Sequence, residues 1–234
     1  MFWEVVGKTK MAYVYLKASE GGSRIDDKYK QNIDLAHSYG LKVGSYHFYR
    51  PRISQVEQLH NFMAQCRPGD QDLLPMIDVE TRSGLSKEEF RDSLSKFLVL
   101  VEKAYRQRPL VYTGTSFYNA NLQGLLDDYK LMIAQYSTRQ PVLADGKEYI
   151  LWQYTGKGHL DGINGYVALN GDFPPQFPGA WKAVDNSYYP LPDVESWKAF
   201  YAAMVATGAA HFAHAQELKA LLSSATTIEE VEAI

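Results

Sequence analysis

The sequence predicts an α/β fold: a (β/α) barrel of the TIM-like type, followed by a helical C-terminal appendage. Two observations lead to this prediction. Strand-like and helix-like segments alternate over the first half of the chain, which is typical of parallel strands covered by helices. After Leu126 the strand-like segments are joined without convincing helices, and a proline-rich stretch then precedes an alanine-rich tail.

Four strand–helix units are predicted in order. The strands cover residues 13–17, 42–48, 73–80 and 110–113, and the helices that follow them cover residues 26–39, 54–65, 86–106 and 116–126. Helix ends carry the expected residues: Gly40 closes the first helix, and Ser54 is placed to cap the second. The third helix opens with Ser86 and Glu89 in capping-box spacing.

Three more strand-like segments follow, over residues 130–136, 149–154 and 165–169, without helices between them. The total of seven strands is one short of an eight-stranded barrel. We therefore expect the first strand of the barrel to be missing from this chain, so that it precedes Met1 or comes from elsewhere.

The chain is expected to divide into three parts. Residues 1–173 form the barrel, residues 174–192 a proline-rich linker, and residues 193–234 a segment of two or three helices. The tail has no recognisable chemistry, so packing or formation of an oligomer through these helices is the expected role. A separate module that recognises the substrate surface is the alternative.

Composition excludes several classes of protein. The 234 residues are 46% hydrophobic and 22% charged, which is enough to bury a sizeable core. The net charge of -3, with scattered Lys and Arg, argues against a nucleic-acid partner. The single cysteine, Cys66, excludes an intramolecular disulfide framework. We expect neither a transmembrane segment nor a signal peptide, because no run of about 18 apolar residues and no signal-type start occurs.

The sequence gives no indication of a metal or another cofactor. The six histidines occur without HExxH or Cys/His ligand spacing, and neither a serine elbow nor a glycine-rich phosphate loop is present. No cofactor is therefore expected.

The strongest chemical signal is the pair Asp78 and Glu80, at the end of an apolar run. Side chains alternate along a strand, so these two carboxylates share a face about 6–7 Å apart. Such a pair is suited to glycoside hydrolysis, in which one group donates a proton and the other stabilises positive charge. The alternative is that both are solvated acids at a strand end.

Polar and aromatic residues gather at the predicted carboxyl ends of other strands, where parallel α/β barrels place their active sites. Aromatic rings and amides around two acids are suited to a neutral, N-acetylated sugar. The candidate substrate-binding residues are Lys17, Glu20, Tyr46, Phe48, Tyr112, Tyr136, Trp152 and Gln153.

Several motifs together resemble glycoside hydrolase family 25, the muramidases of phage endolysins and bacterial autolysins. YVYLKASEG at 13–21 is similar to the family's F-x-Y-I-K-A-T-E-G, and VGSYHFYR at 43–50 to its V-G-x-Y-H-F. LLPMIDVE at 73–80 is similar to L-P-x-x-D-x-E, and LWQYTGKGHLDGINGYVALN at 151–170 to the family's closing W-Q-Y motif. The order and spacing of these motifs carry the resemblance.

The resemblance implies an irregular barrel, with five β/α units followed by strands joined without helices. It also implies that Glu80 is the general acid for the β-1,4 bond between N-acetylmuramic acid and N-acetylglucosamine, and that Asp78 stabilises the transition state. The implied partner is bacterial cell-wall peptidoglycan, reached by a phage lysin or an exported enzyme, so localisation stays open. Tyr46, Phe48, Tyr112, Tyr136 and Trp152 would line the sugar subsites.

Two departures from the family pattern leave alternatives open. The strand that normally supplies a first aspartate is absent, and Ala168 replaces the aspartate of the closing motif. The second hypothesis is therefore a catalytically weakened, peptidoglycan-binding or virion structural relative. A third, a chitinase of family 18, is disfavoured because residues 74–77, LPMI, lack the further acids of that family's motif.

Overall fold

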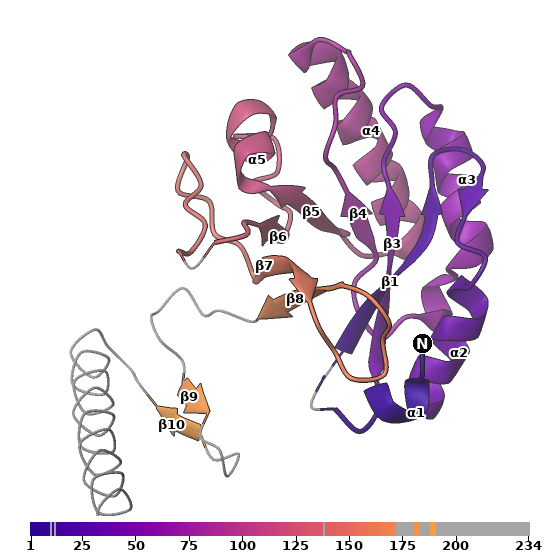
Figure 1. Cartoon of the computed structure of the whole chain (residues 1–234). Coiled ribbons are helices and arrows are strands. Elements are labelled where there is room, and N and C mark those ends of the chain that lie inside the picture. The colour runs from indigo at the N-terminus through magenta and orange to yellow at the C-terminus, as the bar shows by residue number, and fades with distance from the viewer. Residues whose placement is uncertain (10, 12, 138, 172–179, 183–187, 191–234) are drawn as a thin grey trace, which may run out of the picture. The chain divides into compact units, whose positions relative to one another are not determined.

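The computed structural model describes residues 1–9, 11, 13–137, 139–171, 180–182 and 188–190 (Figure 1). The chain forms two compact units, Met1–Asp172 and Phe173–Ile234. The first unit contains every candidate site residue and is described first.

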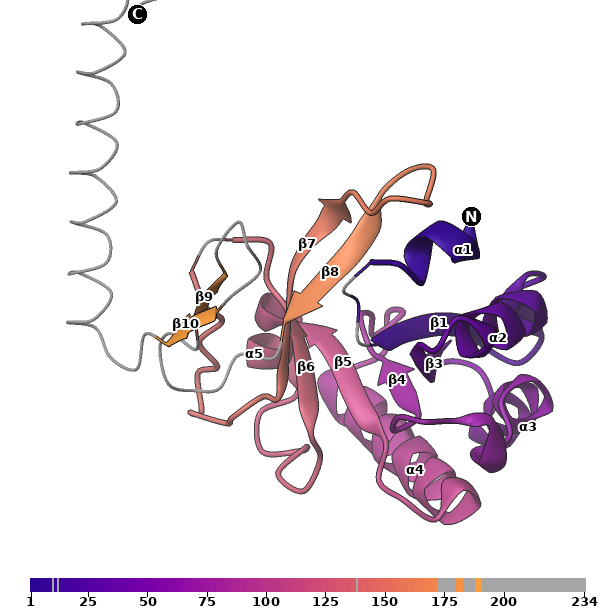
Figure 2. The same ribbon diagram turned by 90° about the horizontal axis from the view of Figure 1, so that it is seen from below.

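An eight-stranded sheet forms the centre of the first unit, with the strand order β2-β1-β3-β4-β5-β6-β7-β8. Its strands are β1 (Tyr13–Glu20), β2 (Arg24–Ile25), β3 (Lys42–Phe48), β4 (Met76–Asp78), β5 (Leu110–Gly114), β6 (Leu131–Ala134), β7 (Leu151–Gly158) and β8 (Val167–Gly171). From β1 through β3 to β7, neighbouring strands are parallel, while β2 and β8 are antiparallel to their neighbours. The sheet curls into a half-barrel (Figure 2).

Helices join the parallel strands from β1 to β6 and lie on the outer face of the sheet (Figure 1). They are α2 (Tyr29–Ser38), α3 (Gln55–Gln65), α4 (Lys87–Tyr105) and α5 (Thr115–Asn121), with a 3-10 turn η1 at Pro68–Asp70. A short helix, α1 (Trp3–Val6), precedes β1, and within the described residues no helix stands between β6 and β7. The predicted caps are confirmed. Ser54 accepts a hydrogen bond from the backbone N–H of Glu57, Ser86 and Glu89 form a capping box, and Gly40 follows α2 with a φ of 80°.

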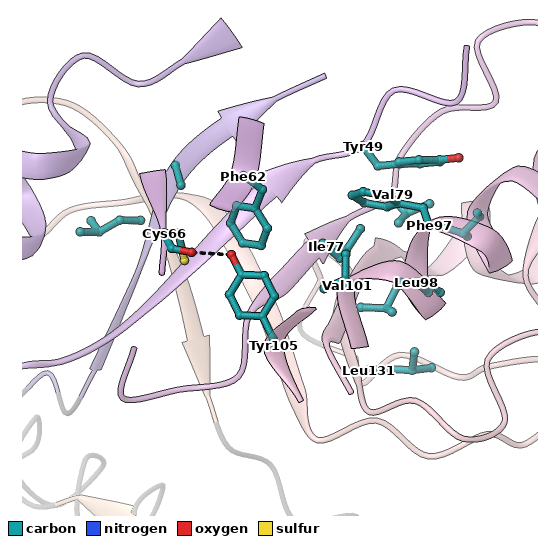
Figure 3. Packing of buried hydrophobic residues seen from close by; sticks show 14 of the residues in the cluster. Tyr49, Phe62, Cys66, Ile77, Val79, Phe97, Leu98, Val101, Tyr105 and Leu131 are labelled. Carbon is teal, nitrogen blue, oxygen red and sulfur yellow. Dashed lines mark hydrogen bonds between the residues drawn. The ribbon is translucent and has the colours of Figure 1, made fainter. Parts of the chain in front are cut away.

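The main core lies between this outer face and the helices. Phe62 from α3 packs against Tyr105 from α4, and Ile77 and Val101 are fully buried in the same cluster (Figure 3). Burial of each such side chain contributes about 1.5–3 kcal/mol. Cys66 is a buried free thiol whose backbone oxygen accepts a hydrogen bond from Tyr105.

The structure confirms the α/β class and corrects the predicted strand count. All seven predicted strands are present, but the sheet has an eighth, β2, which at two residues is too short to give a sequence pattern. Among the described residues no pairing joins β8 to β1, so the sheet is a half-barrel and not a closed ring. Near this opening, the backbone N–H of Phe2 donates to the Gly162 oxygen at 2.7 Å.

The second unit is described only in part. Two short strands, β9 (Ala180–Lys182) and β10 (Tyr188–Pro190), pair antiparallel within the stretch predicted as a linker. The predicted helices over residues 193–234 lie outside the described residues. Within the described part of the chain, no helix has the length and apolar character needed to cross a membrane.

Candidate active site

The strand registers align four candidate residues in one row. Glu20 on β1 is paired with Phe48 on β3, Phe48 with Asp78 on β4, and Asp78 with Tyr112 on β5. Neighbouring strands lie about 4.8 Å apart, so the row spans roughly 15 Å across the inner face. It lies at the carboxyl ends of parallel strands, where barrels of this class bind their substrates.

A bulge in β1 lets two charged residues of that strand meet on the inner face. The register shifts between Lys17, which is paired with Tyr46, and Ser19, which is paired with His47. The extra residue changes the alternation of side chains, so that Lys17 and Glu20, three positions apart, form an ion pair of 2.7 Å.

Asp78 is buried in an unusual way for an acid. Only 7% of the residue is exposed, and its Oδ1 has no hydrogen-bond partner among the described residues. The pKa of Asp78 is raised to about 8, mainly by burial and in addition by the negative charge of Glu80. The positive charge of Lys17 opposes this shift. Asp78 is therefore mostly protonated at neutral pH while the site is empty.

Glu80 lies just beyond the strand end. β4 ends at Asp78, and the next residue, Val79, still donates its backbone N–H to the backbone oxygen of Tyr112 on β5. Glu80 is exposed, unlike Asp78. The structure thus places a solvent-accessible carboxyl group beside a buried one. Both acids lie near Tyr112, since burial and then the charges of Tyr136, Glu80 and Asp78 raise the pKa of its hydroxyl.

Gln153 connects two of the candidate tyrosines. The hydroxyls of Tyr112 and Tyr136 both donate to its Oε1, each at 2.9 Å. Tyr136 is 66% exposed and lies against Gly156, where an added β-carbon would be 3.1 Å from its ring. Two donors occupy the amide oxygen, which leaves the amide nitrogen of Gln153 to donate to a carbonyl group of a ligand.

Comparison with known proteins identifies the family. The model for glycosyl hydrolases family 25 matches residues 1–163. This chain belongs to glycosyl hydrolase family 25. A second model, for a domain of unknown function called DUF4376, matches residues 132–234 and so extends over the C-terminal unit.

Curated relatives of this family 25 protein are similar over 72% of the chain. The uncharacterized protein YegX of Escherichia coli strain K12 is 34% identical over 173 residues, which cover 72% of this chain and 63% of YegX. An autolytic lysozyme of Clostridium acetobutylicum is 32% identical over 72% of this chain and 51% of its own length. The chain thus spans less than two thirds of the length of either relative.

Solved structures of family 25 share the fold. A family 25 glycosyl hydrolase from Bacillus anthracis superimposes with a TM-score of 0.68 at 26% identity, covering 74% of this chain and 83% of that one. The bacterial lysozyme of Streptomyces coelicolor gives a TM-score of 0.66, also at 26% identity, covering 73% of this chain and 85% of that one.

Most candidate residues of this family 25 protein lie on the inner face, but Trp152 does not share it with Gln153. Strand alternation places these neighbours on opposite faces. Trp152 is 4% exposed and is paired with Ile133 of the main core, and its indole N–H donates to the Gln135 oxygen at 2.9 Å. The tryptophan therefore lies beneath the site, where it supports β6 and β7.

Glu20 is held by three basic side chains. Lys17 lies at 2.7 Å, Arg50 at 2.6 Å and Arg24 at 3.3 Å from its carboxylate. Burial disfavours the charged form of Glu20, but hydrogen bonds from Lys17 and Arg50 outweigh that effect and lower its pKa to about 2. Sequence patterns did not single out Arg24 or Arg50, although Arg50 ends the VGSYHFYR motif.

A buried network beneath this cluster also escaped sequence analysis. Ser19 Oγ lies 2.9 Å from His47 Nδ1, and His47 Nε2 lies 3.2 Å from Gln58 Oε1. The Gln58 amide also bonds the backbone N–H and oxygen of Arg50. Burial lowers the pKa of His47 to about 4, which keeps the imidazole neutral near pH 7. The network thus fixes the backbone of Arg50.

Among the described residues, no group of three or more His, Cys, Asp or Glu side chains could hold a metal ion.

Proposed function

We propose that this chain is a peptidoglycan hydrolase that cleaves the β-1,4 bond between N-acetylmuramic acid and N-acetylglucosamine. The observation that carries the proposal is the pairing of buried Asp78 with exposed Glu80 at the carboxyl end of β4, in a chain of glycosyl hydrolase family 25. The name of the Clostridium acetobutylicum relative, an autolytic lysozyme, supports the same activity.

In the proposed reaction, Glu80 donates its proton to the glycosidic oxygen as the bond from that oxygen to the sugar C1 breaks. The acetamido oxygen of the same sugar bonds to C1 and takes up the developing positive charge. Asp78 lies beside it, releases its proton to solvent as the charge develops, and stabilises that charge as a carboxylate. Water then attacks C1 as the bond from C1 to the acetamido oxygen breaks, and the Glu80 carboxylate accepts the water proton, which restores the acid.

The surroundings of Asp78 support this role. Its Oδ1 is buried and has no partner among the described residues, so the carboxyl group can rotate to accept the N–H of the acetamido group without breaking a bond at that oxygen. A positive charge on the sugar favours the ionised form of Asp78, whose pKa burial otherwise holds near 8. Asp78 would thus stabilise the transition state more than the bound substrate.

A glycan-holding relative with weak activity is the second candidate. It is favoured by Ala168, an exposed residue of β8 at the position where the family pattern has an aspartate. In this candidate the row of inner-face residues binds sugar, and turnover is slow or absent.

Analysis of the products tests the proposal. Purified peptidoglycan is incubated with the protein, the new reducing ends are reduced with borohydride, and the reduced sugars are identified by mass spectrometry. Reduced N-acetylmuramic acid is the expected product. Reduced N-acetylglucosamine would assign the cleavage to the other bond, and binding without new ends would favour the glycan-holding candidate.

A further inference from the structure

We propose that Lys17, Arg24 and Arg50 form a binding site for an anionic group of the substrate, namely a carboxylate of the peptides that peptidoglycan carries. This inference rests on the proposed function, because it concerns the same site. It adds that the enzyme recognises the peptide-bearing polymer and not only its sugar chain.

The first argument is an imbalance of charge. Three cations surround the single carboxylate of Glu20, whose pKa near 2 keeps it ionised at neutral pH. Among the described residues these three cations form no ion pair with any other carboxylate, so they share one anionic partner. The Glu20 side chain is only 9% exposed, whereas those of Lys17, Arg50 and Arg24 are 33%, 41% and 72% exposed. The excess charge therefore faces solvent.

The second argument is the supply of hydrogen-bond donors. Arg50 uses Nε and Nη2 to bond Glu20, and Arg24 uses only Nη1. Within the described residues, Arg50 Nη1 and Arg24 Nε and Nη2 make no hydrogen bond. Guanidinium groups bind carboxylates and phosphates through paired, charge-assisted hydrogen bonds. The cluster can thus take a second oxyanion without releasing the first.

The third argument is that Arg50 is held in place before any anion binds. The Arg50 guanidinium lies 4.5 Å from the centre of the Phe48 ring, and Gln58 holds both backbone groups of Arg50. Arg50 is therefore held before an anion arrives, which lowers the entropy cost of binding.

The position of the cluster indicates which group it meets. Glu20 is two strands away from Asp78 in the same row, which corresponds to about 10 Å. A substituent on a sugar bound at Asp78 and Glu80 can span this distance. The peptides of peptidoglycan carry carboxylates on such substituents, and the phosphates of wall teichoic acid are another source of oxyanions in the same wall.

The experiment compares the wild type with Arg24→Gln and Arg108→Gln. Arg108 is the matched control: its side chain is 50% exposed and also pairs with a carboxylate at 3.3 Å, but it lies just before β5, at the opposite end of the strands. KM is measured on three substrates: intact cell wall, wall freed of teichoic acid by hydrofluoric acid, and the latter with its carboxylates amidated by methylamine.

Arg24→Gln is expected to raise KM about three- to tenfold on the wall freed of teichoic acid, and less at high salt, because an exposed charge pair is screened. On the amidated wall its KM should equal that of the wild type, and Arg108→Gln should match the wild type throughout. The proposal is overturned if Arg24→Gln behaves like Arg108→Gln, or if its effect survives amidation. An effect confined to intact wall would assign the site to phosphate and overturn the carboxylate.

If the proposed hydrolase function is wrong, the result differs from that of a wrong anion site. If the wild type releases no reducing ends, the dissociation constants of the three proteins for the same three preparations are measured by co-sedimentation. The ratio of variant Kd to wild-type Kd on each preparation is then expected to follow the pattern predicted for KM. The anion site is thus tested even without hydrolysis.

Discussion

At the residue scale, Asp78 is the side chain whose environment departs most from that of a solvated acid. Its folded pKa of about 8 lies above the unfolded value near 3.8. The folded state therefore binds a proton that the unfolded state loses, and folding is favoured most below pH 4. This contribution to stability is lost as pH rises from about 4 to 8.

The substitution Asp78→Asn tests this environment. Since Asn cannot ionise, we expect the stability of Asp78→Asn relative to the wild type to be greater at pH 8 than at pH 4.5, by on the order of 4 kcal/mol. Urea unfolding at both pH values measures the difference. Asp92→Asn, on the exposed face of α4, is the control. A difference for Asp78→Asn that does not change with pH would show that Asp78 is not buried as described.

Sequence analysis predicted which candidate residues stand at strand ends, but not their contacts. Asp78, Glu80 and the aromatic residues stand at recognisable strand ends. Their partners depend on register and on bulges, which come from long-range packing. Thus the two hydroxyls that meet at Gln153 and the two arginines beside Glu20 could not be predicted from local pattern.

At the scale of elements, α4 illustrates how local signals determine a helix. Its capping box satisfies backbone donors of the first turn, and Phe90, Leu94, Phe97 and Val101 recur at spacings of three and four residues and are buried. These signals lie within one segment of sequence, which is why its ends were predicted within one residue. By contrast, α1 and β2 have four and two residues, too few to show a period.

The cap of α4 gives the second prediction. Ser86→Ala removes the hydroxyl that accepts the Glu89 N–H at 3.2 Å, and should cost about 1 kcal/mol of stability. Denaturant unfolding measures this loss, and Ser86→Asp, which restores an acceptor, should recover most of it. No loss in Ser86→Ala, or an equal loss in Ser86→Asp, would mean that the hydrogen bond from the Glu89 N–H does not stabilise the helix.

At the scale of the whole molecule, the chain separates into two compact units, and all candidate residues belong to the first. We expect a chain ending at Asp172 to unfold cooperatively and to retain the hydrolytic activity of the full chain. Thermal unfolding followed by circular dichroism, together with release of reducing ends, checks both points. Loss of cooperative unfolding would show that the first unit needs residues beyond 172.

The most direct test of the central claim is release of reducing ends from purified peptidoglycan by the wild type, Glu80→Gln and Glu148→Gln, side by side. Glu148 is an exposed glutamate in the loop before β7 and serves as the matched control. We predict that Glu80→Gln lowers kcat by at least about a hundredfold while peptidoglycan binding is kept, because proton donation is lost. Turnover by Glu80→Gln equal to that of the wild type would contradict the assignment of Glu80 as the acid.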